Sequence, residues 1–351
     1  MNAKFALCFF LAVAASAQQT KPSYVAFVVP GAGTSPTQGT YPLAINAANT
    51  IVGYDEDSAS LYHGFARASD GTITVFDAPG AGTVEYEGTW SESINRAGVI
   101  AGYYSDAGGV YHGFVRASDG TFATFDAPAA EGTYGMSISD AGFVTGYYLD
   151  ASHVSHGFVR AGNGTITDLD VPAAVNTYGM SINDTGDVTG YFWDARTVVH
   201  GFVRANNGTI DTFDAPGAGN LFEQGTASQV INSSGNVAGH YIDVNYVYHG
   251  FVRARDGAIA TFDVPEAGAG PYQGTYGFSM NNAGVVTGSY IDGSNVYHGF
   301  VRARSGAILR FNNPGAGDMG TGGYGINDTG AVTGNYIAAP KDVPRGFLLT
   351  P

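Results

Sequence analysis

The 351-residue sequence is acidic and rich in glycine and aromatic residues, which excludes several classes of protein. It contains 30 acidic and 15 basic residues, for a formal net charge of −15, and this charge repels nucleic acid and anionic membrane surfaces. With 52 Gly, 22 Tyr, 21 Phe and only 13% charged residues, the composition is typical of many short strands joined by tight turns. We therefore expect an all-β protein without a nucleic-acid partner.

Residues 1–17 have the layout of a cleaved secretory signal peptide. Lys4 precedes a short apolar run that ends in Ala-Ser-Ala, and this run is too short to span a bilayer. The only cysteine, Cys8, lies inside the run, so the mature chain would have no thiol, no disulfide and no cysteine metal site. We expect a soluble, monomeric protein, residues 18–351, secreted to the periplasm or the medium without membrane insertion.

The first predicted strand after this signal covers residues 24–29, and it resembles the last strand of a unit that then recurs along the chain. The clearest landmark is His-Gly-Phe, which begins at His63, His112, His156, His200, His249 and His298, with Arg345-Gly346-Phe347 as a seventh copy. Each unit has four predicted strands, A to D; in the second unit they lie near residues 89–95, 99–105, 110–117 and 121–126.

Strands C and D of each unit form a predicted hairpin, as in residues 111–126, where Asp119-Gly120 occupies the turn. Asp-Gly accepts the positive φ angles of a two-residue type I′ turn. A two-residue loop fixes the register, because each residue then has a defined partner on the other strand. It predicts that Phe65 faces Phe76, Phe114 faces Phe125 and Phe251 faces Phe262.

Four-stranded units at a period of 44 to 49 residues are typical of β-propeller blades, whose sheets stack radially and bury faces that one sheet would expose. The chain begins with an unpaired D-like strand and ends with strand C, residues 346–350, without its D strand. We therefore predict a single seven-bladed β-propeller domain over residues 18–351. Its ring would be closed 1+3 by the N-terminal strand, with Phe27 opposite Phe347, which leaves few exposed edges.

The repeated blocks G-x-I-x-x-F-D-x-P-G-A-G, S-I-N-x-x-G-x-V-x-G-Y-Y and H-G-F resemble the HAF family of extracellular bacterial repeats, with His-Gly-Phe where that family often has His-Ala-Phe. The resemblance covers residues 24–351 and implies an exported β-propeller-like protein. It brings no catalytic residues that could be carried over. The departures are Arg345 for the repeated His, Leu349 for the repeated Arg and Asn312 for the repeated Asp.

Histidine, arginine and aspartate recur at equivalent positions, and we interpret them as parts of the scaffold. Neighbouring blades are packed sheets about 10 Å apart, whereas Zn–N bonds are about 2 Å long, so one ion cannot collect histidines from several blades. The repeated residues are His63, His112, His156, His200, His249 and His298; Arg67, Arg116, Arg160, Arg204, Arg253 and Arg302; and Asp77, Asp126, Asp170, Asp214 and Asp263.

A further aspartate opens the loop between strands B and C in six units: Asp57, Asp106, Asp150, Asp194, Asp243 and Asp292. We predict that each caps its own turn, as Asp commonly does. Only residues 55–57, Asp-Glu-Asp, concentrate several carboxylates, and they lack the spaced pattern of a dedicated calcium loop. The sequence therefore predicts no metal site and no cofactor, and it leaves open only a weak Ca²⁺ site at residues 55–57.

Residues that break the repeat are the best candidates for a site, because a function is grafted onto a scaffold. The D–A loops, from strand D of one unit to strand A of the next, vary in length and should share one face with the B–C loops. The candidates for ligand binding there are Glu85, Tyr86, Glu87, Trp90, Phe222, Glu223 and Tyr272. Glu92 and Gln229 are added because five equivalent strand-A positions are apolar.

Two classes of function fit this pattern. The first is a non-catalytic binding module whose aromatic and acidic rim holds a glycan or a protein partner, with no catalytic residue. The alternative is an extracellular polysaccharide hydrolase or lyase at the channel mouth, using Glu85, Glu87 or Glu92 with His153 or His240. If two of these carboxylates and histidines lie within hydrogen-bond distance in a concave pocket, the enzyme is favoured over the binding module.

Overall fold

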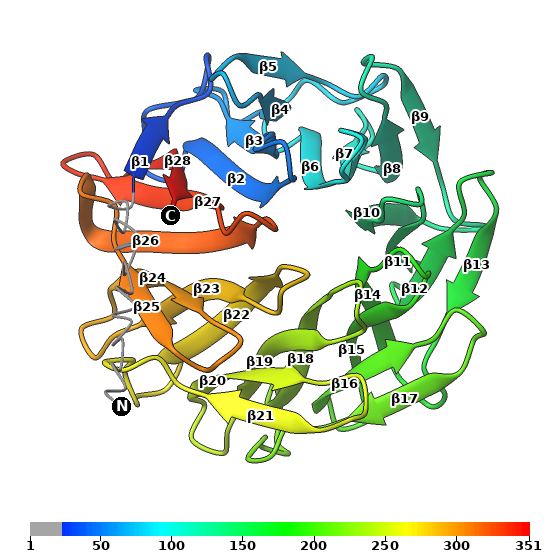
Figure 1. Ribbon diagram of the computed structural model, residues 1–351. Coiled ribbons are helices and arrows are strands. Elements are labelled where there is room, and N and C mark those ends of the chain that lie inside the picture. Colours follow the sequence, from blue (N-terminus) through cyan, green and yellow to red (C-terminus); the bar gives the residue numbers. More distant parts are fainter. Residues whose placement is uncertain (1–22) are drawn as a thin grey trace, which may run out of the picture.

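The computed structural model describes residues 23–351, and every helix or strand element in this range is a β-strand. The predicted signal peptide, residues 1–17, lies outside the described residues. The strands form four-stranded antiparallel groups arranged around a central opening (Figure 1). Between Ser23 and Pro351 the chain forms no helix with the length and hydropathy that crossing a bilayer requires.

Each group contains consecutive strands that correspond to the predicted A, B, C and D. The first three groups are β2 (Gly39–Ile45), β3 (Ile51–Glu56), β4 (Tyr62–Arg67) and β5 (Ile73–Phe76); β6 (Gly88–Ile94), β7 (Ile100–Ser105), β8 (Tyr111–Arg116) and β9 (Phe122–Phe125); and β10 (Gly132–Ile138), β11 (Val144–Leu149), β12 (Ser155–Arg160) and β13 (Ile166–Leu169). The predicted bounds in the second unit are thus confirmed to within two residues.

The later groups repeat this order. They are β14 (Asn176–Ile182), β15 (Val188–Trp193), β16 (Val199–Arg204) and β17 (Ile210–Phe213); β18 (Gly225–Ile231), β19 (Val237–Ile242), β20 (Tyr248–Arg253) and β21 (Ile259–Phe262); β22 (Gly274–Met280), β23 (Val286–Ile291), β24 (Tyr297–Arg302) and β25 (Ile308–Phe311); and β26 (Ala316–Ile326), β27 (Val332–Ala338) and β28 (Val343–Thr350), joined by β1 (Ser23–Phe27).

The N-terminal strand completes the last group, as the sequence predicts, because β1 pairs antiparallel with β28. The predicted partner of Phe27 is wrong by one residue. Phe27 lies opposite Gly346, and Ala26 lies opposite Phe347. The first and last strand groups also meet at the turns after β2 and β26, where the Asn327 side chain donates to the backbone oxygen of Asn46 at 2.9 Å.

The predicted register of the C–D hairpins is wrong by one residue, because the loops that contain Asp-Gly have three residues and not two. In the first hairpin Gly71 donates to Ala68 and Ala68 donates to Thr72, with Gly71 at φ +93. This is a type I turn followed by a left-handed glycine, a common three-residue hairpin loop. The predicted phenylalanine pairs are accordingly replaced by Gly64–Phe76, Gly113–Phe125 and Gly250–Phe262.

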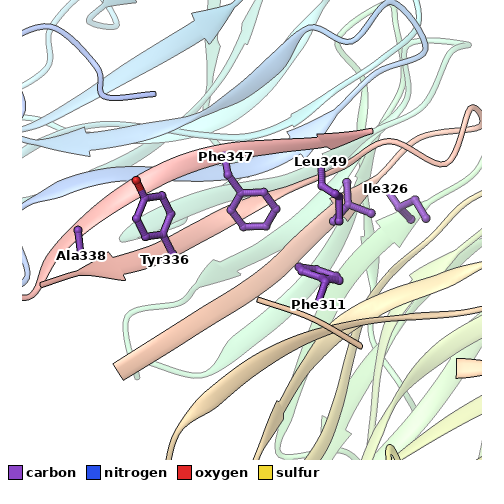
Figure 2. Packing of buried hydrophobic residues seen from close by; sticks show 7 residues of the cluster. Phe311, Ile326, Tyr336, Ala338, Phe347 and Leu349 are labelled. Carbon is purple, nitrogen blue, oxygen red and sulfur yellow. The ribbon is translucent and has the colours of Figure 1, made fainter. Parts of the chain in front are cut away.

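The shifted register explains why the repeated unit contains glycine next to phenylalanine. Successive strand residues face opposite sides of a sheet, so Phe65 points into the core and Gly64 faces the other side. Because Gly64 has no side chain, the Phe76 ring can lie against its backbone. A Cβ atom at Gly64 would lie 2.6 Å from that ring. Figure 2 shows the core of the last group, where Phe347 packs with Phe311 and Tyr336.

Neighbouring groups are also joined by the repeated arginines, which confirms their place in the scaffold. The Arg116 guanidinium lies 4.3 Å from the centre of the Phe76 ring in the preceding group, a cation–π contact. Equivalent contacts join Arg67 to Phe27, Arg160 to Phe125, Arg253 to Phe213 and Arg302 to Phe262. The Arg67–Phe27 contact therefore links β1 to the first group.

Candidate ligand-binding site on the loop face

The repeated histidines hold their strands in place rather than gathering at a site. His112 Nδ1 lies 2.8 Å from Asp126 Oδ1 at the end of the neighbouring strand, and its ring stacks on Tyr104 at 5.0 Å between centroids. The same pairs are His63–Asp77, His156–Asp170, His200–Asp214, His249–Asp263 and His298–Asn312. Within residues 23–351 no group of three or more His, Cys, Asp or Glu side chains has a geometry suited to a metal ion.

The B–C loop aspartates cap their own turns, as the sequence predicts. Asp106 Oδ1 accepts hydrogen bonds from the backbone of Gly108 at 2.8 Å and Val110 at 2.9 Å. These donors lower the pKa of Asp106, with the Val110 bond as the largest cause. The carboxylates of these loops are therefore already used by the backbone.

Asp55 departs from the scaffold pattern. In the five following groups its position carries an aromatic ring, such as Tyr104 or Tyr148, that stacks on the repeated histidine. The Asp55 side chain is buried, its Oδ1 has no hydrogen-bond partner, and burial raises its pKa to about 7.

The two faces of the molecule differ in character. The face opposite the D–A and B–C loops is built from A–B and C–D turns, in which asparagine side chains link one group to the next; Asn46 Nδ2, for example, donates to the backbone oxygen of Asn95 at 3.2 Å. The D–A and B–C loops together with the strand ends beside them, which we call the loop face, carry most of the large exposed apolar side chains: Val84, Tyr86, Val110, Val175, Leu221, Phe222, Val244, Tyr272, Tyr297 and Met319.

The loop face contains a groove of about 470 Å³, a volume in the range of small-ligand sites. Strands β2, β3 and β4 form it together with three loops, one of which leads from β5 to β6. Its lining residues are Pro36, Thr37, Gln38, Tyr41, Tyr54, Glu56, Ser60, Tyr62 and Tyr86. We call it the tyrosine groove.

Aromatic stacking holds the walls of the tyrosine groove. The rings of Tyr41 and Tyr54 are stacked at 4.9 Å between centroids, and Tyr54 meets the edge of Tyr62 at 5.8 Å. Tyr62 in turn packs against Trp90 at 4.7 Å. Trp90 is only 8% exposed, so it supports the groove from behind and does not project from the rim.

Glu56 is the acidic group of the tyrosine groove. Burial raises the pKa of its carboxyl, and a hydrogen bond from Ser60 opposes that shift. The equivalent residues in other groups are Ser105, Leu149, Trp193, Ile242 and Ile291. Glu56 is 7% exposed, and its carboxylate lies among four tyrosines that line the same groove. It can accept hydrogen bonds from a ligand whose rings or apolar faces lie on the aromatic walls.

The predicted site residues of the second unit have different roles in the structure. Tyr86 is 62% exposed at the edge of the groove, and a hydrogen bond to Glu85 raises the pKa of its hydroxyl. Glu87 is buried, and its Oε2 accepts from the Val84 backbone at 3.1 Å, so it closes the D–A loop. Gln224 and Gln273 make the equivalent contacts in later loops.

The remaining predicted residues lie away from the tyrosine groove. Phe222, Glu223 and Tyr272 belong to the loops around β18 to β22. Glu92 and Gln229 lie on β6 and β18, which border the central opening (Figure 1). Burial raises the pKa of Glu92 to about 7.

Sequence reasoning missed Tyr41, Tyr54, Glu56 and Tyr62 as lining residues. Tyrosine recurs at some of these positions in other units, so the sequence alone does not distinguish these tyrosines from residues of the scaffold. The feature of the sequence that could have indicated the groove is Glu56, because its position is acidic in the first unit alone.

The carboxylates and histidines of the predicted hydrolase do not meet. In residues 23–351 no hydrogen bond or ion pair joins any two of Glu85, Glu87, Glu92, His153 and His240. His153 Nδ1 lies 3.9 Å from Glu131 Oε2 in an exposed ion pair. These five side chains therefore form no acid–base pair with one another.

No family model matches the sequence, and neither does any curated protein. Several solved structures share its architecture. A streptogramin B lyase is 14% identical with a TM-score of 0.57, covering 93% of this chain and 97% of that one. A puromycin hydrolase is 12% identical with a TM-score of 0.54, covering 85% of this chain and 50% of that one.

These likenesses concern the fold alone, because fold is shared across unrelated activities. Together with the all-β groups around a central opening, they define the class: the chain is a repeat protein of the β-propeller type.

Proposed function

We propose that the protein is an exported β-propeller of seven blades, closed by β1, that belongs with the HAF-type repeats and acts as a non-catalytic binding module for neutral carbohydrate. The pairing of β1 with β28 and the Asn327–Asn46 hydrogen bond support the closure. The tyrosine groove carries the functional part of the proposal.

The chemistry of the groove favours a neutral carbohydrate. A sugar ring presents apolar C–H faces that pack on aromatic rings, and hydroxyl groups that need polar partners at their edges. Tyr41 and Tyr54 supply stacked rings, and Glu56 and Ser60 supply polar groups. Neither Lys nor Arg lines the groove, so an anionic ligand would meet Glu56 without a compensating cation.

Binding of neutral oligosaccharides by residues 18–351 on a glycan array tests this proposal. Tyr86→Ala should weaken binding by about 10-fold, because an exposed aromatic at the edge of a groove contributes mainly to recognition. Val84→Ala is the matched control, since Val84 is equally exposed in the same loop but does not line the groove. Both variants should unfold at the temperature of the parent protein.

Fluorescence supplies a second, local readout. The chain has two tryptophans, so Trp193→Phe leaves Trp90, which packs behind Tyr62, as the only reporter. A sugar in the groove should change Trp90 emission in a saturable way. The proposal is wrong if the protein binds no neutral oligosaccharide, or if Tyr86→Ala binds as tightly as Val84→Ala.

A further inference from the structure

The loop face carries a second aromatic cluster that occupies the same place in its group as the tyrosine groove does in the first. In the first group Tyr86 donates its backbone N–H to Ser60 at 2.8 Å; in the later group Tyr272 donates to Tyr246 at 2.7 Å. Tyr86 and Tyr272 both have a left-handed backbone, with φ of +69 and +63. The backbone thus presents a loop tyrosine in the same manner at both places.

The second cluster, which we call the aromatic platform, consists of Phe222, Tyr246 and Tyr272. Phe222 and Tyr272 are 59% and 55% exposed. The rings of Tyr246 and Tyr272 lie 5.7 Å apart, and the Tyr246 hydroxyl donates to the Phe222 backbone oxygen at 3.3 Å. This bond ties two loops together, so the platform is held in place without a ligand.

The positions beneath the platform also correspond to those of the groove. His240 packs against Tyr248 at 5.5 Å, as Tyr54 packs against Tyr62 in the first group. His240 Nδ1 is buried and has no hydrogen-bond partner in the structure. Ala227 stands opposite His240, where the first group has Tyr41 opposite Tyr54.

The two loops that carry Phe222 and Tyr246 disfavour an anionic ligand. Residues 219–225 and 243–248, which form two of its loops, contain Glu223 and Asp243 but no Lys or Arg. Leu221 and Val244 extend the exposed apolar surface beside Phe222. Aromatic faces with acidic and amide neighbours match the same neutral, hydroxyl-rich ligand class as the groove.

We propose that the aromatic platform is a second carbohydrate-binding site, and that groove and platform together hold one neutral polysaccharide at two points. Figure 1 shows β2 and β6 across the central opening from β18 and β22. A polymer that reaches both sites converts the second contact into an intramolecular event, which raises affinity by about 10²- to 10⁴-fold without any new contact. This inference rests on the proposed function of the groove.

Titration calorimetry with neutral trisaccharides of glucose, mannose, galactose and xylose tests the number of sites. We expect two molecules of the binding trisaccharide per chain of the parent protein. Tyr86→Ala and Tyr272→Ala should each weaken one of these two sites by about 10-fold and leave the other unchanged. The polysaccharide of the same sugar should bind the parent protein at least about 10-fold more tightly than either variant. Val175→Ala, an exposed loop-face residue outside both clusters, is the control and should behave as the parent.

The outcomes separate this inference from the function on which it rests. If Tyr86→Ala abolishes binding while Tyr272→Ala binds trisaccharide and polysaccharide like the parent, the platform is not a site and the groove remains one. A single molecule per chain in the parent protein overturns the two-site inference. If Tyr272→Ala and not Tyr86→Ala then abolishes its binding, the groove is not the site and the proposed function of the groove fails. If no trisaccharide or polysaccharide binds at all, both proposals fail.

Discussion

Phe27, in the first described strand, lies directly across from Gly346, in the last strand of the chain. A Cβ atom at Gly346 would lie 2.5 Å from the Phe27 ring, so only glycine permits this approach without rearrangement. Phe76 and Gly64 meet in the same way inside the first group. The N-terminal strand therefore makes the contact that the fourth strand makes in the first group.

Removal of β1 should destabilise the protein by at least about 3 kcal/mol, because it takes away two partly buried aromatic side chains, Tyr24 and Phe27, and full burial of one such side chain contributes about 1.5–3 kcal/mol. The loss uncovers Gly346 and the unpaired edge of β28, and it removes the ring under Arg67. Denaturant unfolding of a chain that starts at residue 28 measures this effect, with a chain that starts at residue 23 as the control. Equal stability of the two chains would contradict the role of β1.

Stability should depend on His63 at alkaline pH. The hydrogen bond to Asp77 raises the pKa of His63 to about 9 from its ordinary value of 6.5. Because the folded state holds the proton more tightly, this stabilisation is complete below pH 6.5 and is lost as pH rises through about 9. His63→Gln should flatten the pH dependence of unfolding between pH 6.5 and 9. An unchanged slope in that variant would exclude a charged His63.

Asp55→Tyr should stabilise the protein, because it restores the ring that stacks on the repeated histidine in other groups. Asp55 is buried, and its Oδ1 lacks a partner; such a group usually costs about 1–3 kcal/mol. Its raised pKa, about 7, means that wild-type stability falls as pH rises from 4 to 7. The gain measured by denaturant unfolding should therefore be larger at pH 8 than at pH 5.

Asp55→Asn is the matched control for this change, since it removes the charge without adding a ring. It should lose the pH dependence between 4 and 7 but gain less stability than Asp55→Tyr. If Asp55→Tyr is less stable than the parent at pH 8, the Asp55 carboxylate stabilises the first group and the prediction is wrong.

The strand groups were predictable from sequence because each unit repeats the same residues at the same spacing. The register was not, since Asp-Gly fits both a two-residue loop and a three-residue loop with a left-handed glycine. Tyr86 could be found because the D–A loops break the repeat. Trp90 was predicted on the rim, but it faces Tyr62 and Tyr103, and only the packing of neighbouring strands determines that orientation.

Glu56 shows the opposite limit. In the sequence it stands between two aspartates, and this cluster suggests only a weak Ca²⁺ site. In the structure Asp57 caps its own turn, Asp55 is buried, and Glu56 alone lines the groove. Adjacent strand residues face opposite sides of a sheet, so three consecutive acidic residues need not share one environment.

The last prediction separates scaffold from site at Glu87. Its carboxylate accepts from the Val84 backbone, and glutamine makes the equivalent contact at Gln224 and Gln273. Glu87→Gln should therefore keep both the stability and the carbohydrate affinity of the parent protein. Glu87→Ala should lower the free energy of unfolding by about 1–2 kcal/mol, because the Val84 backbone N–H loses its acceptor. Thermal unfolding and glycan binding measured on the same preparations check this. If Glu87→Gln folds normally but loses binding, the carboxylate itself contacts the sugar and the groove extends into the D–A loop.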